Sequence, residues 1–424
     1  MAVSITQKIS TALKDSSLRN RVLFVLGILV VFRILAAIPI PGIDAARLQE
    51  FFSNNQFLGL LNIFSGGGLS NLSVVMLGVA PYITASIIMQ LLTVMSSRLK
   101  AMYQEEGEAG RKKFTQYSRI ITVPLAFAQA FGFLILLERQ GIILSLGVFD
   151  FATNILLITA GSVLLMWLGE LITEYGIGNG VSIIIFAGIV SRIPKTLTQT
   201  LFTFDPSQIP TYLGFLAAAV IIIAGIVFIT EAERPIPITY ARRVRGMKVY
   251  GGISTYLPLR VNQAGVMPII FALSILLFPQ LIFRFLEGVS NVTIAKISEI
   301  GLSILNNAWL YAGMYFVLVF LFTYFYTAVT FDPDSIAKNL QKSGAFIPGV
   351  RPGQNTAEYI GRILTRLTFV GATFLAVLAV LPIGMRAVTG LATLAIGGTA
   401  VLIVVQVILD IVRRVESQLS IQEY

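Results

Sequence analysis

The sequence contains no cysteine and no histidine, and charged residues are scarce in it. Without these two residue types the chain has no disulfides, no zinc site built on Cys or His, no Ser-His or Cys-His nucleophilic pair and no imidazole proton relay. No cofactor or metal is therefore expected. Charged residues make up 12% of the chain, whereas soluble globular domains average about 25%. With 56% hydrophobic residues and a mean hydropathy of +0.83, the 424-residue chain is predicted to be a polytopic membrane protein.

Ten apolar runs are candidates for membrane-spanning helices, which need roughly 17 to 25 residues each. The runs cover residues 22–40, 74–95, 120–137, 154–171, 181–191, 212–230, 266–285, 309–330, 364–381 and 391–412, of which the fifth is the shortest. The polar segment 1–20 lacks the features of a cleavable signal, and the first apolar run is long enough to stay as a span. We therefore predict an all-α integral membrane protein with ten spans.

Basic residues are distributed unequally between the two sides that ten spans would create. Most of the 31 Lys and Arg residues fall in the N-terminal arm, the C-terminal tail and the connections on the same side as these termini. The positive-inside rule then places both termini in the cytoplasm. The net charge of +10 is interpreted as a topology signal and as affinity for anionic phospholipids or an acidic partner, rather than for nucleic acid.

Ten spans divide into two sets of five, and an odd number of spans in each half means that any internal duplication is inverted in the membrane. The predicted halves are residues 1–191, with spans one to five, and residues 192–424, with spans six to ten. A weak pattern supports this division. Pro81 in the second span and Pro268 in the seventh each precede an isoleucine by two residues.

Three consecutive glycines, Gly66, Gly67 and Gly68, interrupt the apolar stretch that leads into the second span. Glycine favours turns over helix, and a non-helical joint at membrane depth must be buried in protein or line a cavity. A half-length segment joined to a full span therefore suggests a path through the membrane.

Two long loops on the side predicted to be cytoplasmic exceed the usual connection length. Residues 231–262 alternate β-favouring and basic residues around the turn-like Gly251-Gly252, which predicts a protruding hairpin. Residues 332–362 contain a short helix predicted to start after Asp334 or Ser335, and a tip from Pro348 to Gly353. Two prolines and two glycines stiffen this tip and present Arg351 outward. The simpler alternative is that both loops are only charged topology markers.

Four runs in the sequence, 81–87 (PYITASI), 176–183 (GIGNGVSI), 254–262 (STYLPLRVN) and 346–353 (FIPGVRPG), occur in an order and spacing that resemble bacterial SecY. Members of the SecY family are the channel subunits of the protein-conducting translocon. The resemblance covers the ten spans and both long loops. It implies an hourglass pore between two inverted five-helix halves, in the bacterial plasma (inner) membrane.

The resemblance further implies a ring of six aliphatic side chains at the waist of that pore. The matching positions are Ile83, Ile87, Val181, Ile185, Ile270 and Ile403. The first four form two pairs at i, i+4, which places each pair on one helix face. Branched apolar side chains can exclude water and ions, yet bind no particular peptide sequence. Without the resemblance, these residues are better explained as facing lipid or a neighbouring helix, as isoleucines in membrane helices usually do.

Two moving parts follow from the same resemblance. Residues 60–73 match the plug, a short helix in the outer funnel beneath the ring, with Gly66, Gly67 and Gly68 as its hinge. A lateral gate is implied between the second and third spans and the seventh and eighth, through which signal sequences enter lipid. Thr84, Ser86, Gln90 and Ser274 lie on the gate helices, and Gln90 either faces the seam or bonds within its own bundle.

The long loops are implied to dock the ribosome or the motor ATPase SecA. Arg351 is the strongest candidate contact, followed by Arg242, Arg243, Arg245 and Lys248. Further expected partners are SecE, SecG, SecDF, YidC and the translocating polypeptide. The run 107–112 lacks the spacing of a P-loop, so the energy for transport must come from a partner or a gradient.

Two other classes of protein were compared with this interpretation. A secondary transporter would share inverted halves and broken helices, but it usually carries ionisable residues at mid-membrane. Here Glu138, Glu170, Glu231 and Asp410 fall near span ends, and Arg33 is the one deep charge, expected to pair with a carbonyl or snorkel outward. An intramembrane enzyme finds no support, since the chain offers no His or Cys.

Overall fold

The computed structural model describes residues 15–41, 65, 67–139, 141, 143, 147–191, 193–194, 198, 202, 209–240, 243–245, 248–250, 254–286, 292–389 and 397–422. Contacts divide the chain into two compact units. Unit 1 comprises Met1–Tyr212, Ser274–Asn306 and Ile403–Tyr424, and unit 2 comprises Leu213–Leu273 and Asn307–Leu402. The boundary predicted at residue 191 separates two halves related by an internal duplication of the spans, which is a different division from these units. It stays a prediction.

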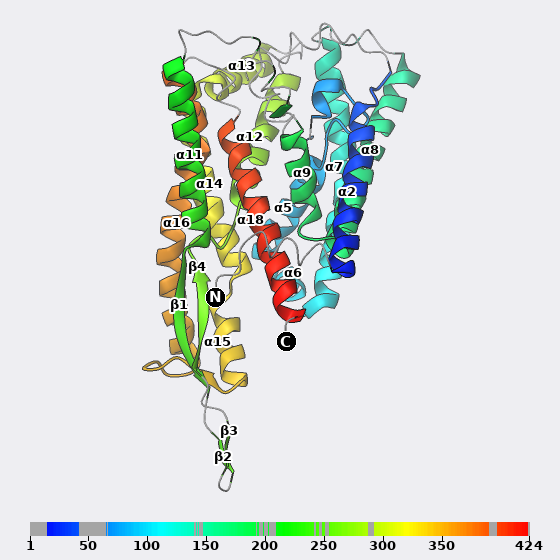
Figure 1. The fold of residues 1–424 in the computed structure, drawn as a ribbon. Coiled ribbons are helices and arrows are strands. Elements are labelled where there is room, and N and C mark those ends of the chain that lie inside the picture. Colours follow the sequence, from blue (N-terminus) through cyan, green and yellow to red (C-terminus); the bar gives the residue numbers. More distant parts are fainter. Residues whose placement is uncertain are drawn as a thin grey trace. The chain divides into compact units, whose positions relative to one another are not determined.

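A helix covers most of each of the ten predicted spans (Figure 1), and residues 391–396 of the tenth lie outside the described residues. These helices are α2 (Ser16–Ala37), α5 (Ala80–Met95), α7 (Gly107–Arg139), α8 (Val148–Tyr175), α9 (Gly180–Val190), α11 (Ile209–Glu231), α12 (Met267–Leu286), α14 (Ala308–Thr330), α16 (Gln354–Thr389) and α18 (Gly397–Gln422). The second span was predicted to start at Val74. The helix starts six residues later because residues 74–79 form turns, with Gly78 at a φ of 59°.

Five helices among the described residues, α2, α7, α8, α14 and α16, are long and apolar enough to cross a membrane by themselves. A sixth span results if α5 is taken together with α6 (Ser97–Gln104), although the two helices are bent by 114° at their junction. Shorter apolar helices occupy the predicted fifth, sixth and seventh spans. One more helix, α13 (Val292–Asn306), connects α12 to α14 in the sequence.

Several helices begin at a side chain that caps their free N–H groups. The carboxylate of Asp15 accepts hydrogen bonds from the N–H groups of Ser17 and Leu18 at the start of α2. Asn179 and Asn307 cap α9 and α14 in the same way. Asp332 caps α15 (Pro333–Lys342), so this helix starts two to three residues before the predicted position.

In unit 1, α7 packs against α5, α6 and α8, and α8 also contacts α2 and α9. One apolar cluster joins α7 and α8 to the turns before α5, and its fully buried members include Leu72, Phe133, Leu134 and Ile158. A smaller cluster of Met89, Met102 and Phe114 fixes α6 beneath the end of α5. Helix α8 is therefore in contact with each of α2, α5, α7 and α9.

In unit 2, the two long loops form one folded body on the ends of the helices. Strand β1 (Glu233–Tyr240) pairs antiparallel with β4 (Ser254–Arg260), which confirms the predicted hairpin. Inside it, β2 (Arg243–Arg245) pairs with β3 (Lys248–Tyr250), so the chain reverses between Arg245 and Lys248 and not at the predicted Gly251-Gly252. The other edge of β1 pairs with β5 (Ala345–Phe346) from the second loop. This three-stranded sheet packs with α15 on the start of α16 (Figure 1), and we call the assembly the sheet body.

Candidate pore, plug and docking residues

Helix α8 fixes the start of α5, which carries Ile83 and Ile87. A side chain at Gly161 would overlap the backbone carbonyl of Val74, so the turn before α5 lies directly on the α8 backbone. One residue further on, the buried hydroxyl of Ser162 donates a hydrogen bond to the carbonyl oxygen of Gly78, at 2.9 Å. A glycine and a serine thus allow the close approach that small residues provide between membrane helices.

Ile83 and Ile87 are buried, with 7% and 3% of their surface exposed. From Ala80 to Gln90 no residue of α5 is exposed, whereas Val94 and Met95 near its end are 67% and 83% exposed. Over these eleven residues, about three turns, the side chains of α5 are therefore buried or half-buried.

The predicted second pair, Val181 and Ile185, lies on α9, and close contact between Gly180 and Gly169 holds the start of this helix against α8. Gly178 has a φ of 94°, which other residues rarely adopt. A side chain at Gly180 would overlap the carbonyl oxygen of Gly169. The hydroxyl of Thr173 accepts a hydrogen bond from the Gly180 N–H at 2.9 Å and donates one to Gly169. Ile185 is buried and Val181 is half-buried.

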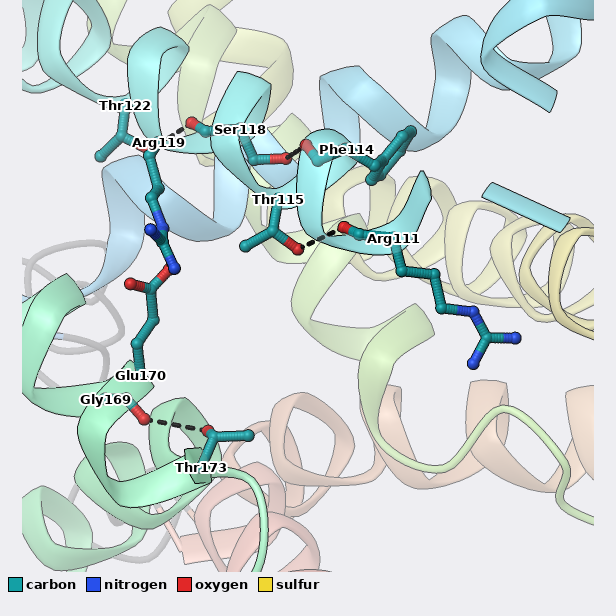
Figure 2. Close-up of polar contacts among 9 residues, drawn as sticks. All are labelled: Arg111, Phe114, Thr115, Ser118, Arg119, Thr122, Gly169, Glu170 and Thr173. Atoms are coloured by element: carbon teal, nitrogen blue, oxygen red, sulfur yellow. Dashed lines mark hydrogen bonds and ion pairs between the residues drawn. The ribbon is translucent and has the colours of Figure 1, made fainter. Parts of the chain in front are cut away.

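An ion pair that the sequence did not predict joins α7 to α8, one turn before Thr173 (Figure 2). The Nε atom of Arg119 lies 2.6 Å from Oε1 of Glu170, and their side chains are 45% and 17% exposed. Arg119 directly precedes the predicted third span and Glu170 ends the fourth. Because consecutive spans run antiparallel, their positions could have indicated that the two charges meet on one side of the membrane.

The same stretch of α7 has a modified backbone hydrogen-bond pattern. The hydroxyls of Thr115, Ser118 and Thr122 each donate to the carbonyl four residues earlier (Figure 2), and Pro124 lies inside the helix. Such hydroxyl bonds and internal prolines favour bending of a helix. Arg119 therefore holds α7 to α8 within a segment that is suited to bend.

The deep charge Arg33 of α2 donates a hydrogen bond from Nη1 to the hydroxyl of Ser191, directly after α9, at 3.0 Å. The sequence analysis expected Arg33 to pair with a backbone carbonyl or to snorkel outward, and it did not predict this hydroxyl as a partner. The contact ties α2 to the end of α9.

The described part of the predicted plug, residue 65 and residues 67–73, forms a tight turn in the core of unit 1. The hydroxyl of Ser65 caps the short 3-10 helix Leu69–Asn71, and Leu69 and Leu72 are fully buried. Backbone bonds from Ile40 to Leu72 and from Val74 to Ile38 tie the turn to the segment after α2. Gly67 has a φ of 87°, and a side chain at Gly68 would contact Ser73 and Val75. Gly66 and residues 60–64 lie outside the described residues.

The two remaining ring candidates are also buried. Ile270 of α12 is 2% exposed, beside Phe271, whose ring packs edge-on against Phe322 and Tyr326 of α14. Ile403 of α18 is 1% exposed. Ile270 belongs to unit 2 and the other five candidates to unit 1, so the ring stays a prediction.

The polar residues predicted near a lateral gate differ in their contacts. The Thr84 hydroxyl donates to the Ala80 carbonyl in its own helix, at 3.0 Å. The side-chain oxygen of Gln90 is buried and accepts no hydrogen bond from any described residue. Ser274 has a polar or electrostatic partner. Neither proposed role of Gln90 is decided by these contacts.

Arg351 is exposed at the tip of the second loop, as predicted. Gly349 and Gly353 on either side have φ values of 82° and 101°, and the Thr356 hydroxyl donates to the Arg351 carbonyl. Beneath the tip, Ile347 and Val350 pack into the apolar core of the sheet body with Ile236, Leu259 and Ile360. Arg243, Arg245 and Lys248 lie on β2 and β3, and Arg242 lies outside the described residues.

Comparison with solved structures defines the class of protein. A SecY structure, described as one in which the plug domain stabilises the closed state of the translocation channel, matches 93% of this chain and 91% of that chain, with a TM-score of 0.64 and 20% identity. The idle yeast Ssh1 complex bound to the yeast 80S ribosome matches 97% and 94%, with a TM-score of 0.61 and 14% identity. The fold is that of the ten-helix, all-α membrane channels.

Sequence comparison specifies the family within that class. The sequence model of SecY matches residues 73–412. The protein translocase subunit SecY of Mycobacterium tuberculosis (strain ATCC 25618 / H37Rv) is 42% identical over 435 residues, which cover 98% of each chain. The chain belongs to the SecY family.

Proposed function

We propose that this chain is the channel-forming subunit of a bacterial protein translocase. It passes unfolded polypeptides across the plasma membrane and releases signal sequences and transmembrane segments sideways into lipid. The observation that carries this proposal is the 42% identity over 98% of both chains to a protein translocase subunit SecY. We also propose that the chain itself performs no catalysis and that both termini are cytoplasmic, the latter because most Lys and Arg residues lie on their side.

The pore ring is the first element of the mechanism. Ile83, Ile87, Val181, Ile185, Ile270 and Ile403 close the pore with apolar branches that neither bind ions nor recognise a peptide sequence. Support comes from the way α8 holds both α5 and α9 through backbone contacts, which fixes four of these positions relative to one another. Rigid support of this kind is what a narrow seal requires.

A photoreactive residue at Ile87 tests the ring directly. During export of a substrate stalled by a folded C-terminal domain, the probe should crosslink the translocating polypeptide. The matched control is a probe at Met95, which lies two turns further along the same helix and is 83% exposed. Equal crosslinking at both positions, or none at Ile87, would contradict the proposed pore.

The plug is the second element, with Gly66, Gly67 and Gly68 at its hinge. The packing of Leu69 and Leu72 changes how this proposal must be tested. Deleting residues 60–73 removes buried core, whereas deleting residues 60–64 leaves the packed turn intact. The shorter deletion should raise ion leak through the resting channel without loss of accumulated protein. Similarly, alanine at Gly67 or Gly68 strains the turn itself, so slowed export of such variants is informative only if their thermal stability is unchanged.

Docking of a partner that supplies energy is the third element. The sheet body presents Arg351, with the β2–β3 tip carrying Arg243, Arg245 and Lys248, to SecA or to the ribosome; related channels are described in ribosome complexes. We expect Arg351→Glu to block SecA-dependent export while the protein remains inserted and folded. Lys342→Glu makes the same charge change on exposed α15 of the same body and should transport nearly normally. Normal export by the Arg351→Glu variant would contradict the proposal that Arg351 is a docking residue.

The remaining partners are SecE, SecG, SecDF and YidC. Copurification from bacterial membranes with a tag on this chain tests them one by one. Reconstitution separates the proposed channel from a secondary transporter. A channel leaks ions when the ring isoleucines become glycine, whereas a carrier shows saturable uptake of a solute.

A further inference from the structure

Helix α13 is a short amphipathic helix between two membrane spans, and one of its faces is packed on protein. Ser298, Leu302 and Leu305 are buried on this face. On the same side, a side chain added at Gly301 would lie 2.6 Å from the Phe283 ring near the end of α12. Figure 1 shows α13 running crosswise beside the end of α12. The helix is therefore fixed in place by contact with a span.

A second face of α13 is apolar and exposed. Ile297, Ile300 and Ile304 have 56%, 54% and 42% of their surface exposed. Their spacing of i, i+3 and i+7 places the three side chains in one stripe along the helix. We call them the isoleucine stripe. Removing apolar surface from water is favourable, so water is a poor environment for three such side chains in a row.

A third face is polar and also exposed. Lys296, Glu299 and Ser303 each precede one member of the isoleucine stripe by one residue. One residue corresponds to about 100° of rotation around an α-helix. The polar stripe thus lies roughly a quarter turn from the isoleucine stripe and about a third of a turn from the buried face.

Three faces that suit protein, lipid and water occur together where a helix lies flat at the membrane surface. Residues on either side of α13 support a position at the membrane surface. Trp309 is 75% exposed in the first turn of α14, three residues after α13 ends, and tryptophan is enriched at membrane-water interfaces. Ile282, near the end of α12, is a further exposed apolar side chain, at 44%.

We propose that α13 is an interfacial helix whose isoleucine stripe inserts into the bilayer while Lys296, Glu299 and Ser303 face water. The chain crosses the membrane once through α12 between the sheet body and α13. By the positive-inside rule, the leaflet is the extracytoplasmic one. The occupant of the stripe is the acyl-headgroup boundary of phospholipid. This inference depends only on the chain spanning a membrane and does not rest on protein transport.

The absence of cysteine from the chain makes a clean test possible, because every introduced cysteine is unique. Ile297→Cys, Ile300→Cys and Ile304→Cys are spin-labelled in the full-length protein in phospholipid vesicles. Collision with oxygen, which concentrates in lipid, is compared with collision with a water-soluble nickel chelate. The matched controls are Lys296→Cys and Ser303→Cys on the polar stripe and Leu302→Cys on the buried face.

We expect the three isoleucine positions to collide several-fold more with oxygen than with nickel, and the polar-stripe positions to show the reverse. Leu302→Cys should be shielded from both reagents. Nickel access at the isoleucine stripe equal to that at Ser303→Cys would show that the stripe faces water. Shielding from both reagents would show that protein covers it. Either result at two of the three positions overturns the proposal, so failure of one variant to fold leaves it testable.

Discussion

The contacts of α8 and the core of the sheet body hold the same chain together by different means. Around α8, glycines and hydroxyls let backbones touch, through Gly161, Ser162, Gly169 and Thr173. In the sheet body, aliphatic side chains exclude water from one shared core. The difference follows from the solvent. Lipid gives no hydrophobic gain for bringing helices together, so close packing and hydrogen bonds must hold them, whereas water drives apolar side chains inward.

Glycine at position 180 should be the most sensitive point around α8. Gly180→Ala places a methyl group into the carbonyl oxygen of Gly169, where only a backbone shift can relieve the overlap. Overpacking of this kind costs about 1–3 kcal/mol or more. We expect a lower melting temperature and reduced accumulation in membranes. Gly27→Ala in α2 is the matched control, because no atom lies within 4 Å of a side chain there. Equal stability of the two variants would disprove the contact.

Removing a core side chain should loosen the sheet body alone. Ile360 is fully buried between α16 and the sheet, and Ile360→Ala should destabilise this body by about 2–5 kcal/mol. Limited proteolysis within residues 231–262 would then occur at lower urea concentration, while the melting of the membrane helices changes little. Tyr359→Ala, at a neighbouring residue that is 37% exposed, serves as control. Unchanged protease resistance of the Ile360 variant would refute the shared core.

The ion pair between Arg119 and Glu170 should have a smaller effect, since both charges are partly exposed. Glu170→Gln and Arg119→Gln are each expected to lose about 1–2 kcal/mol, and less at high salt. The double variant should cost less than the sum of the two single variants, because the second change removes a charge already left without its partner. Melting temperatures of the four proteins measure this coupling. Strict additivity would mean that the pair contributes no stability.

A single hydroxyl should have the smallest effect. Ser162→Ala removes the bond to the Gly78 carbonyl, and interhelical bonds of this kind average about 0.6 kcal/mol in membrane proteins. Thr153→Ala removes a hydroxyl that bonds only within α8 and should be neutral. A shift in thermal stability for Thr153→Ala as large as that for Ser162→Ala would show that the bond from α8 to the α5 turn has no special role.

Helix positions were predictable because span length and charge distribution are local properties. Each of the ten apolar runs became a helix, and the hairpin at residues 231–262 was confirmed. The start of α5 was predicted six residues too early because apolar composition does not distinguish a span from a buried turn. At residues 74–79, contact with Gly161 and Ser162 of α8 holds the turns.

The sequence alone determined that this chain crosses a membrane many times and which side of the membrane carries most of its Lys and Arg residues. Its motifs also determined which family it resembles. Only the tertiary structure decided which residues of the chain are in contact. The pairing of β5 with β1, the ion pair of Arg119 with Glu170, and the contact of Gly169 with Gly180 join residues that are distant in sequence or separated by a turn. Such contacts depend on complementary shape and distance in three dimensions, and hydropathy records neither of these.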